Sequence, residues 1–219
     1  MSMLFSMVGV TPDQAAALRA SPSLANDLAV VAQNDAQETS RRDILDQLPA
    51  ERRKDAEVRF QALQASPLFQ EARNQRAQAH ARLASLDPFE PALALDKSWH
   101  ILHYVFTGNI GPVGSPGDAL MTGDDLGGDM GYGPPRLHGP EDTRKFADFL
   151  EALDPDKLQA RLNYRAMNEI GVYSMPMGPG SEAEFESGIR REVASYFPRL
   201  RDYVVQMAEK KNGLLMWLT

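Results

Sequence analysis

The stretch that decides the fold is residues 95–140, LDKSWHILHYVFTGNIGPVGSPGDALMTGDDLGGDMGYGPPRLHGP. Its first part predicts a helix with apolar side chains on more than one side. Trp99, Leu102, His103 and Phe106 share one face of this helix, and Ile101 and Val105 are apolar residues on another side. Because a helix that is apolar nearly all round is a buried one, this helix is predicted to be the central core element.

The ends of this helix and the segment after it carry their own signals. Asp96 is expected to cap the start, and Gly108 suits a left-handed position at the end. Ten of the sixteen glycines fall between residues 108 and 139. We expect short strands within this segment, at 118–122 and 132–138, joined by turns that glycine permits.

The two ends of the chain predict the rest of a small sheet. Residues 3–10 are apolar and end at Thr11-Pro12-Asp13-Gln14, which is a helix start with a capping box. The following helix should end before Ser21-Pro22, and a second helix should run from about Ser23 to Gln33. Residues 214–218 are predicted to form a last strand that pairs with the first.

Helical signals also follow the glycine-rich segment. Pro140-Glu141-Asp142 and Asp154-Pro155 each suit the first turn of a helix. Ser181 and Glu184 form a capping box that opens a long helix. Pro198 is expected to kink or split this helix.

Residues 35–85 differ in character from both flanks. They are rich in Ala, Gln, Arg and Glu, with sparse apolar residues, and Pro49 and Pro67 divide them into about three helical pieces. This stretch carries a net charge of +1, whereas the remainder carries −8. One interpretation is a charged helical insertion that lies on the main domain, and the other is an interaction arm for a partner or a second copy. His80 is expected to be solvated.

Composition limits the class of protein. A length of 219 residues, with 43% apolar and 24% charged residues, fits one globular domain. The net charge of −7 argues against nucleic-acid binding and is compatible with a basic protein partner. Zero cysteines exclude disulfides and thiolate chemistry. The N-terminus is a poor signal peptide and no apolar stretch is long enough to span a bilayer, which predicts a cytoplasmic protein without membrane contact.

Several stretches resemble the bacterial YfbM-like family, a domain of unknown function. They are MSMLF and VTPDQ near the start, LDKSWHILHYVFTG, GDDLGGDMGYGPPRLHGPEDTRKFADFLEAL and DKLQARLNYRAMNEIGVY. The resemblance covers residues 1–30 and 90–219 and leaves out 35–85. It implies a small α+β domain in a bacterial cytosol. Together with the patterns above, this predicts a single helix-dominated α+β domain over 1–219, with a small antiparallel or mixed sheet and 35–85 as a charged helical insertion. It brings no established activity or cofactor, although some members are associated with immunity-type proteins that neutralise toxins.

The helix and the glycine-rich segment together contain the candidate site residues. These are Trp99, His103, Tyr104, Thr107, Asp129, Tyr132, Arg136 and His138. His103 can act as a general base near neutral pH, oriented by Asp129 or Asp125, while Arg136 holds an anionic group. The competing interpretation is that His103 hydrogen-bonds a loop backbone and fixes the glycine-rich segment to the core. Tyr132 is the better candidate for lining a small-molecule pocket, since Trp99 has the pattern of a core residue.

Metal and phosphate binding are weighed and not predicted. His100 and His103 lie three residues apart, and Asp129 or His138 could complete a zinc site, but this spacing lacks the stronger helical zinc motif. The run Gly127-Gly128-Asp129-Met130-Gly131 is neither a P-loop nor a dinucleotide fingerprint. Asp124, Asp125 and Asp129 match no calcium loop. We therefore predict neither a metal nor a cofactor.

Two hypotheses of function follow, and the sequence leaves the oligomeric state open. The first is a non-enzymatic protein-binding module, of an immunity or inhibitor type, that holds a basic partner through exposed acids such as Asp124 and Asp125. The second is an enzyme or small-molecule-binding domain that uses a cleft around His103, Asp129, Tyr132 and Arg136. The first is favoured because the sequence carries no catalytic signature.

Overall fold

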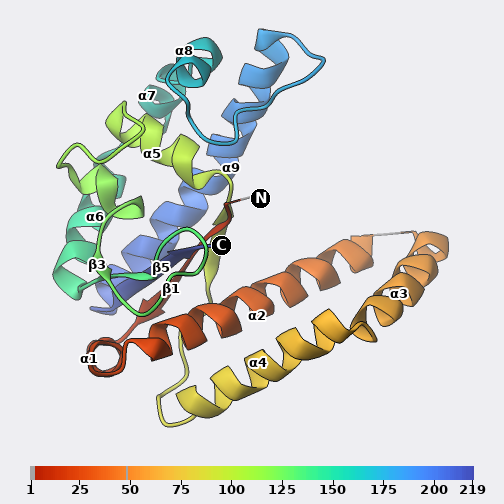
Figure 1. The fold of residues 1–219 in the computed structure, drawn as a ribbon. Helices are drawn as coiled ribbons and strands as arrows, with labels where there is room; N and C mark the ends of the chain where they lie inside the picture. Colours follow the sequence, from red (N-terminus) through yellow and green to blue (C-terminus); the bar gives the residue numbers. More distant parts are fainter. Residues whose placement is uncertain (1–2, 48) are drawn as a thin grey trace.

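A computed structural model describes residues 3–47 and 49–219 and shows the predicted α+β fold, dominated by helices, with a five-stranded sheet. Figure 1 shows the sheet between two groups of helices. The strands are β1 Phe5–Val10, β2 Leu93–Asp96, β3 Asp124–Asp125, β4 Arg136–His138 and β5 Gly213–Leu218. The helices are α1 Pro12–Ala20, α2 Ser23–Gln47, α3 Ala50–Gln64, α4 Pro67–Leu83, α5 Trp99–Thr107, α6 Pro140–Ala152, α7 Pro155–Ala160, α8 Tyr164–Glu169 and α9 Glu182–Glu209, with a 3-10 helix η1 at Pro116–Leu120.

The sheet is antiparallel at each pairing, in the order β2-β1-β5-β4-β3. As predicted, the last strand pairs with the first, in a register that runs from Phe5 opposite Leu218 to Val10 opposite Gly213. Leu4 and Thr219 extend this ladder by two further backbone hydrogen bonds of 2.7 and 3.0 Å. The chain ends therefore form the centre of the sheet.

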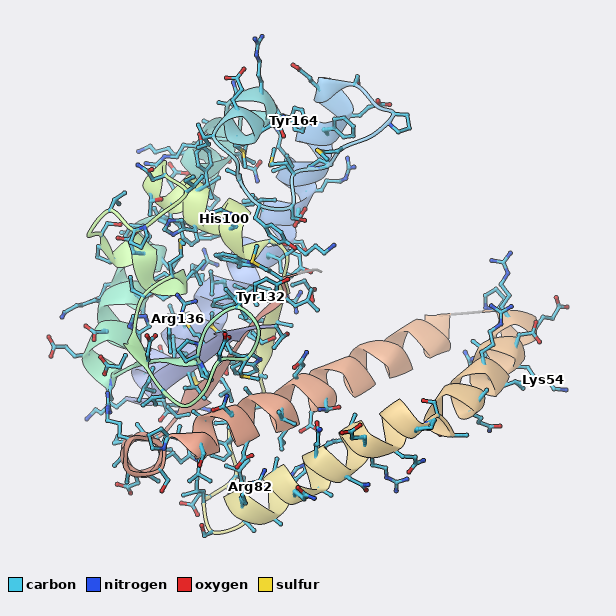
Figure 2. The ribbon with its side chains drawn as sticks, viewed as in Figure 1. Lys54, Arg82, His100, Tyr132, Arg136 and Tyr164 are labelled. Atoms are coloured by element: carbon cyan, nitrogen blue, oxygen red, sulfur yellow. The ribbon has the colours of Figure 1, made fainter. Side chains whose placement is uncertain are left out.

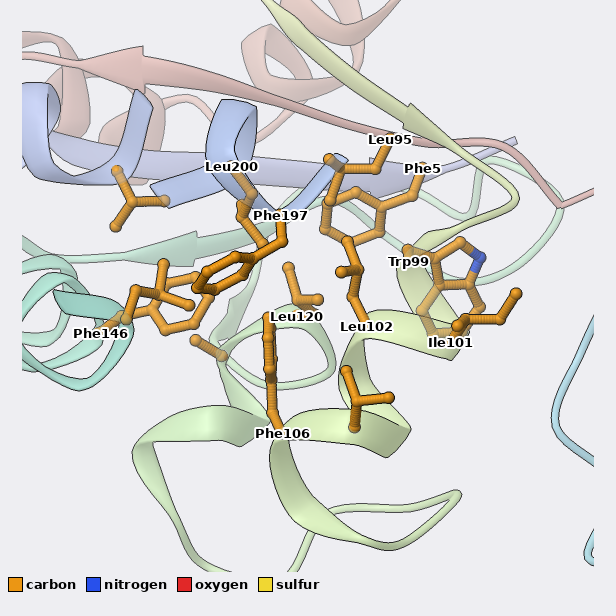
Figure 3. Close-up of a cluster of buried hydrophobic side chains, with 14 of the residues drawn as sticks. Phe5, Leu95, Trp99, Ile101, Leu102, Phe106, Leu120, Phe146, Phe197 and Leu200 are labelled. Atoms are coloured by element: carbon orange, nitrogen blue, oxygen red, sulfur yellow. The ribbon is translucent and has the colours of Figure 1, made fainter. Parts of the chain in front are cut away.

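Alternate side chains of these two strands enter two separate cores. Phe5 and Met7 pack with α5, α6 and α9 on one face, which we call the first core. Val8 and Trp217 pack with α1, α2 and α4 on the opposite face, which we call the second core. Figure 3 shows the first core, where Phe106 and Phe197 meet beside α5. Both faces of the sheet are covered, so both strands are buried at every residue.

Three of the predicted signals at helix ends are confirmed. The capping boxes of Thr11 and Ser181 are both formed, and Gly108 ends α5 with a left-handed φ of 74°. The predicted lengths of two helices, α2 and α9, were wrong. The helix from Ser23 runs to Gln47 instead of Gln33, because residues 34–47 contain no glycine or proline to end it.

The helix α9 continues through Pro198 instead of splitting there. Its buried side chains lie on both sides of the proline and pack against the sheet and α6, so tertiary contacts hold both halves in line. These side chains are Ile189, Val193, Phe197, Leu200, Val204 and Met207.

The region before α5 corrects one prediction. Asp96 does not cap the helix, because residues 93–96 form the edge strand β2, and α5 begins after Ser98. Asp96 instead has a positive φ of 48°, and its carboxylate accepts a hydrogen bond of 2.7 Å from the Tyr196 hydroxyl.

The structure of the glycine-rich segment, residues 108–139, also differs from the prediction. The strand expected at 118–122 is replaced by η1, because the Asp118 carboxylate accepts backbone hydrogen bonds from Val113 and Ser115 and curls the chain. The strand expected at 132–138 is limited to β4, which pairs with both β3 and β5.

Residues 35–85 are helical in three pieces, as predicted, and His80 is exposed. We call α2, α3 and α4 together the arm. Its base covers the second core with Leu28, Val31, Ala79 and Leu83. Arg82 of α4 donates two hydrogen bonds, of 2.6 and 2.7 Å, to the carboxylate of Asp27 in α2. Figure 1 shows the arm projecting beyond the sheet, with α3 at its far end.

Candidate functional site

His100 joins two loops to α5 (Figure 2). Its Nε2 lies 2.9 Å from the carbonyl oxygen of Ile110, and its Nδ1 accepts a hydrogen bond of 2.8 Å from the backbone N–H of Tyr173. Because a carbonyl only accepts and an amide N–H only donates, the proton belongs on Nε2. The ring also stacks on Trp99, with centroids 4.8 Å apart. Both nitrogens are therefore used in holding the fold.

His103 lies one turn further along α5 and is fully buried. Its Nε2 lies 3.2 Å from the carbonyl oxygen of Gly111. Burial lowers the pKa of His103, opposed by the Gly111 carbonyl and by the Asp118 carboxylate. The side chain is thus a neutral imidazole bonded to the loop that follows the helix, without contact with solvent.

The aromatic and hydroxyl residues of α5 also make structural contacts. Trp99 is 4% exposed and stacks on Phe5, with ring centroids 6.0 Å apart. Tyr104 is half-buried against the first core. The Thr107 hydroxyl donates 2.9 Å to the carbonyl of His103 and accepts 3.1 Å from the backbone N–H of Asn109. These contacts end the helix and turn the chain.

Asp129 organises its own turn. Its Oδ1 accepts hydrogen bonds from the backbone N–H groups of Gly131 (2.7 Å) and Gly133 (2.8 Å), and these bonds lower the pKa of the exposed carboxylate. The neighbouring Gly128 exchanges two hydrogen bonds of 2.8 Å with the side chain of Asn26 in α2. This turn is therefore anchored to the arm, whereas Tyr132 is half-buried against the first core.

The two candidate residues of β4 bind backbone carbonyls of the preceding segment. The Arg136 guanidinium donates to the carbonyl of Met121, and burial lowers the pKa of this side chain (Figure 2). His138 Nε2 lies 3.0 Å from the carbonyl of Ala119, and burial lowers its pKa as well. Both side chains fix the segment around η1 against the sheet.

A polar pocket of about 490 Å³ opens beside these elements. Of the eight candidate residues, His138 lines it and the other seven do not. Its wall also includes Ser115, Asp142 and Lys145, and the ammonium of Lys145 is paired with Glu141 and Asp142. The candidate residues are thus divided between the core around α5, the Asp129 turn and β4.

A larger groove, which was not predicted from the sequence, lies between the base of the arm and the edge of the sheet. We call it the arm groove, and its volume is about 730 Å³. It is lined by Val8, Leu28, Val31, Ala32, Asp35, His80, Leu83, Ala84, Leu86, Asp87, Pro88, Phe89, Glu90, Pro91, Ala92, Ala94 and Arg199. Two sequence features could have indicated this groove. They are the alternation of Leu93 and Leu95, which is typical of a strand, and the proline-rich break before them.

Asp124 and Asp125, the acids predicted to bind a basic partner, interact with basic side chains of the chain itself. Asp124 pairs with Arg19 at 3.1 Å, and the charge of Asp125 acts on Arg136. Both form β3, the short edge strand opposite to β2. Within residues 3–47 and 49–219, no group of three or more His, Cys, Asp or Glu side chains is placed to hold a metal ion.

The buried histidines predict how stability depends on pH. The folded-state pKa values of His103 and His138 are lowered by burial, so the unfolded chain binds more protons between the folded pKa and about 6.5. Their contribution to the free energy of unfolding is complete above about pH 6.5 and is lost as the pH falls below it. We expect a lower midpoint of urea unfolding at pH 5 than at pH 7.5.

The control separates these two residues from the other ionisable groups. His103→Gln and His138→Gln should each reduce the difference in unfolding free energy between the two pH values. His80→Gln, at an exposed position of α4, should leave it unchanged. If all three variants show the same difference in unfolding free energy between the two pH values, His103 and His138 are not the cause of the pH dependence.

The fold is an α+β domain with an antiparallel sheet covered by helices on both faces. The chain belongs to the family described as Domain of unknown function (DUF1877), whose sequence model matches residues 1–217. The matched range includes residues 35–85. The fold is similar to the crystal structure of YfbM from Escherichia coli, a protein of unknown function, with 16% sequence identity, a TM-score of 0.51 and coverage of 99% of each chain. A comparison with curated proteins finds no match.

Proposed function

We propose that the chain is a non-enzymatic protein-binding module that holds an extended segment of a partner protein in the arm groove. The observation that carries this proposal is that the groove is lined by Ala94 of β2, which is an edge strand of the sheet among the described residues. Edge strands present unpaired N–H and C=O groups, and strand addition to such an edge is a recurrent mode of peptide recognition.

The walls of the groove come from three parts of the fold. Ala92 and Ala94, at the sheet edge, form its floor, and α2 and α4 of the arm form one side. Arg199 also lines the groove, and it belongs to α9, which packs on the opposite face of the sheet from the arm. The tyrosines that flank Arg199 in α9, Tyr196 and Tyr203, hydrogen-bond to Asp96 and to the carbonyl of Pro91 (2.7 and 2.8 Å), so α9 is fixed along β2. An added strand would contact the arm on one side and α9 on the other.

The chemistry of the lining indicates the kind of segment that fits. Twelve of the seventeen lining residues are apolar or proline, and most of these side chains are small. The lining has three carboxylates and one guanidinium, of which Asp35 and Glu90 pair with Arg76 and Lys210. Asp87 is an exposed carboxylate at the rim. We therefore propose an apolar extended segment with a basic residue next to it.

The contacts of the candidate residues support binding over catalysis. His100, His103 and His138 each bond a backbone carbonyl, and His103 is without solvent contact. The Arg136 guanidinium binds a backbone carbonyl too, so it is engaged in the fold.

Across the described part of the chain, no helix combines the length and apolarity needed to cross a bilayer.

The partner can be identified by placing a photocrosslinking benzoylphenylalanine at Ala94 in the full chain and irradiating it in the cells that express it. A matched crosslinker at Ala152, an exposed position of α6 outside the groove, is the control. We expect one partner segment to be crosslinked from Ala94 and not from Ala152. A synthetic peptide of that segment should compete for the crosslink.

The same peptide then tests the groove. Ala94→Arg places a long charged side chain in it and should weaken peptide binding at least tenfold, which corresponds to about 1.4 kcal/mol. Ala152→Arg should leave the dissociation constant unchanged. Wild-type affinity of the Ala94→Arg variant, measured by calorimetry, would rule out the arm groove as the binding surface.

A further inference from the structure

The hydrogen bonds of β1 show toward which neighbour each of its residues points. In an antiparallel sheet, the N–H and C=O groups of successive residues point alternately to one neighbouring strand and to the other. Leu4 exchanges two backbone hydrogen bonds with Thr219, so Leu4 faces β5, and Ser6 faces β5 as well. Gly9 fits this alternation, because its N–H donates to the Tyr203 hydroxyl (2.9 Å) instead of to β5.

The same alternation fixes the backbone groups of β2. Two opposite residues of an antiparallel pair either exchange both of their hydrogen bonds or both point away from each other. Met7 faces β2 and lies opposite Leu93, so the groups of Leu93 point toward β1. Ser6 faces β5 and lies opposite Ala94. The N–H and C=O of Ala94 therefore point away from β1, at the edge of the sheet.

Tyr203 determines the direction of the peptide unit before β2. Its hydroxyl accepts from the N–H of Gly9 and donates to the carbonyl of Pro91 (2.8 Å), so the Pro91 carbonyl points toward β1. The C=O and N–H of a trans peptide unit point in opposite directions. The N–H of Ala92 therefore points away from β1. Its C=O does so too, because the next N–H, that of Leu93, points toward β1.

The regular part of this edge is short, from Ala92 to Ala94. Pro91 has no N–H, and after Ala94 the register shifts at a bulge and Asp96 has a positive φ of 48°. In antiparallel addition, the residues opposite Ala92 and Ala94 each exchange two hydrogen bonds, so about three partner residues use all four outward groups. A parallel segment needs about five residues for the same bonds, and parallel pairing is slightly less stable. The short edge therefore favours antiparallel addition.

The pairing also places the side chains of the added segment. Ala92 and Ala94 line the arm groove, whereas Leu93 and Leu95 are buried in the first core on the opposite face. Residues that lie directly opposite each other in a sheet have their side chains on the same face. The two partner residues opposite Ala92 and Ala94 therefore face the groove, whose lining is mainly apolar on the side of the arm.

We propose that the partner segment adds antiparallel to β2, with two apolar side chains two positions apart in the groove and a basic residue on their C-terminal side. This inference rests on the proposed function of the arm groove and adds the direction and register of the bound segment. Asp87, an exposed carboxylate of the groove lining, precedes Ala92 in the chain. An antiparallel segment reaches Asp87 with its C-terminal end.

A scan of the synthetic peptide that matches the segment crosslinked from Ala94 tests the direction. Each peptide residue is changed in two ways, by methylating its backbone nitrogen and by replacing its side chain with that of aspartate, and binding is measured by calorimetry. We expect a loss of about tenfold or more at the same two residues in both scans, two positions apart. Scans that are sensitive at alternate residues would show parallel addition, and tolerance of every N-methyl group would exclude strand addition. Either result would overturn the inference.

The variant Asp87→Lys tests the position of the basic residue. We expect it to weaken binding of the unchanged peptide, and we expect binding to recover when a basic residue C-terminal to the two sensitive residues is replaced by glutamate. Asp156→Lys, at an exposed position of α7 outside the groove, is the matched control and should leave the affinity unchanged. Recovery through a basic residue on the N-terminal side would overturn the inference.

The Ala94→Arg variant separates this inference from the proposed function. If that variant binds the peptide with wild-type affinity, the arm groove is not the binding surface and both proposals fail. If it loses the peptide while the two scans of the wild-type complex are sensitive at alternate residues, the groove is the binding surface and only the antiparallel direction is wrong.

Discussion

The substitution Trp217→Ala is expected to lower the free energy of unfolding by about 3–5 kcal/mol. Trp217 is 1% exposed in β5, and its side chain enters the second core, where the base of the arm covers the sheet. Removing the indole opens a cavity between a central strand and the arm. Urea unfolding followed by far-UV circular dichroism measures the loss.

The matched control is Trp217→Phe. The indole N–H of Trp217 has no hydrogen-bond partner among the described residues, so phenylalanine loses volume without losing a bond. We expect a decrease below about 1.5 kcal/mol for this variant. Equal losses in both variants would contradict the prediction, because the two variants differ only in the apolar volume that they keep in the second core.

The second large effect is expected for Gly127→Ala in the glycine-rich segment. Gly127 has a φ of +77°, and an added Cβ would lie 2.7 Å from the backbone oxygen of Pro22 and 2.1 Å from Oδ1 of Asn26. The left-handed conformation costs a side chain about 1–2 kcal/mol, and overpacking against backbone adds about 1–3 kcal/mol. We expect this segment to move away from α2.

Gly131→Ala separates these two costs. Gly131 also has a positive φ, of +107°, but an added Cβ would meet nothing within 4 Å. Its variant should lose only the conformational part, about 1–2 kcal/mol, in the same urea titration. If Gly131→Ala is as damaging as Gly127→Ala, contact with Pro22 is not the cause.

Signals confined to a few neighbouring residues predicted structure well. Thr11 and Ser181 bond to residues three positions away, and Gly108 needs only its own backbone freedom. Their geometry is set within one turn of helix, so the sequence contains the whole interaction. The pairing of the first and last strands was also predictable, since both are short apolar runs bounded by turn or helix-start residues.

The edge strand β2 was not predicted, for a physical reason. Its four residues form a strand because they pair with β1, which lies far away along the chain. Asp96 is a residue type that often caps a helix, yet its carboxylate accepts a hydrogen bond from Tyr196 of α9. A short segment of this kind takes its structure from a neighbour that local patterns do not describe.

The candidate residues illustrate the same limit. The sequence placed His100 and His103 on one buried helix, and the structure shows which loop carbonyls they bind. Whether a buried histidine serves chemistry or holds a loop depends on the path of that loop. The hydrogen bonds between Gly128 and Asn26 could not have been predicted from the sequence, because glycine-rich segments have many accessible paths.

The central position of β1 and β5 has a consequence for how the protein is made. A ribosome releases β1 before β5, and residues 11–212 must be made before β5 can lie beside it. The contacts at the middle of the sheet are thus among the most distant in the sequence, which is a topology that folds slowly. Until β5 has been synthesised, β1 has an uncovered apolar surface that chaperones recognise. We therefore expect the central pairing of the sheet to form only after β5 has left the ribosome.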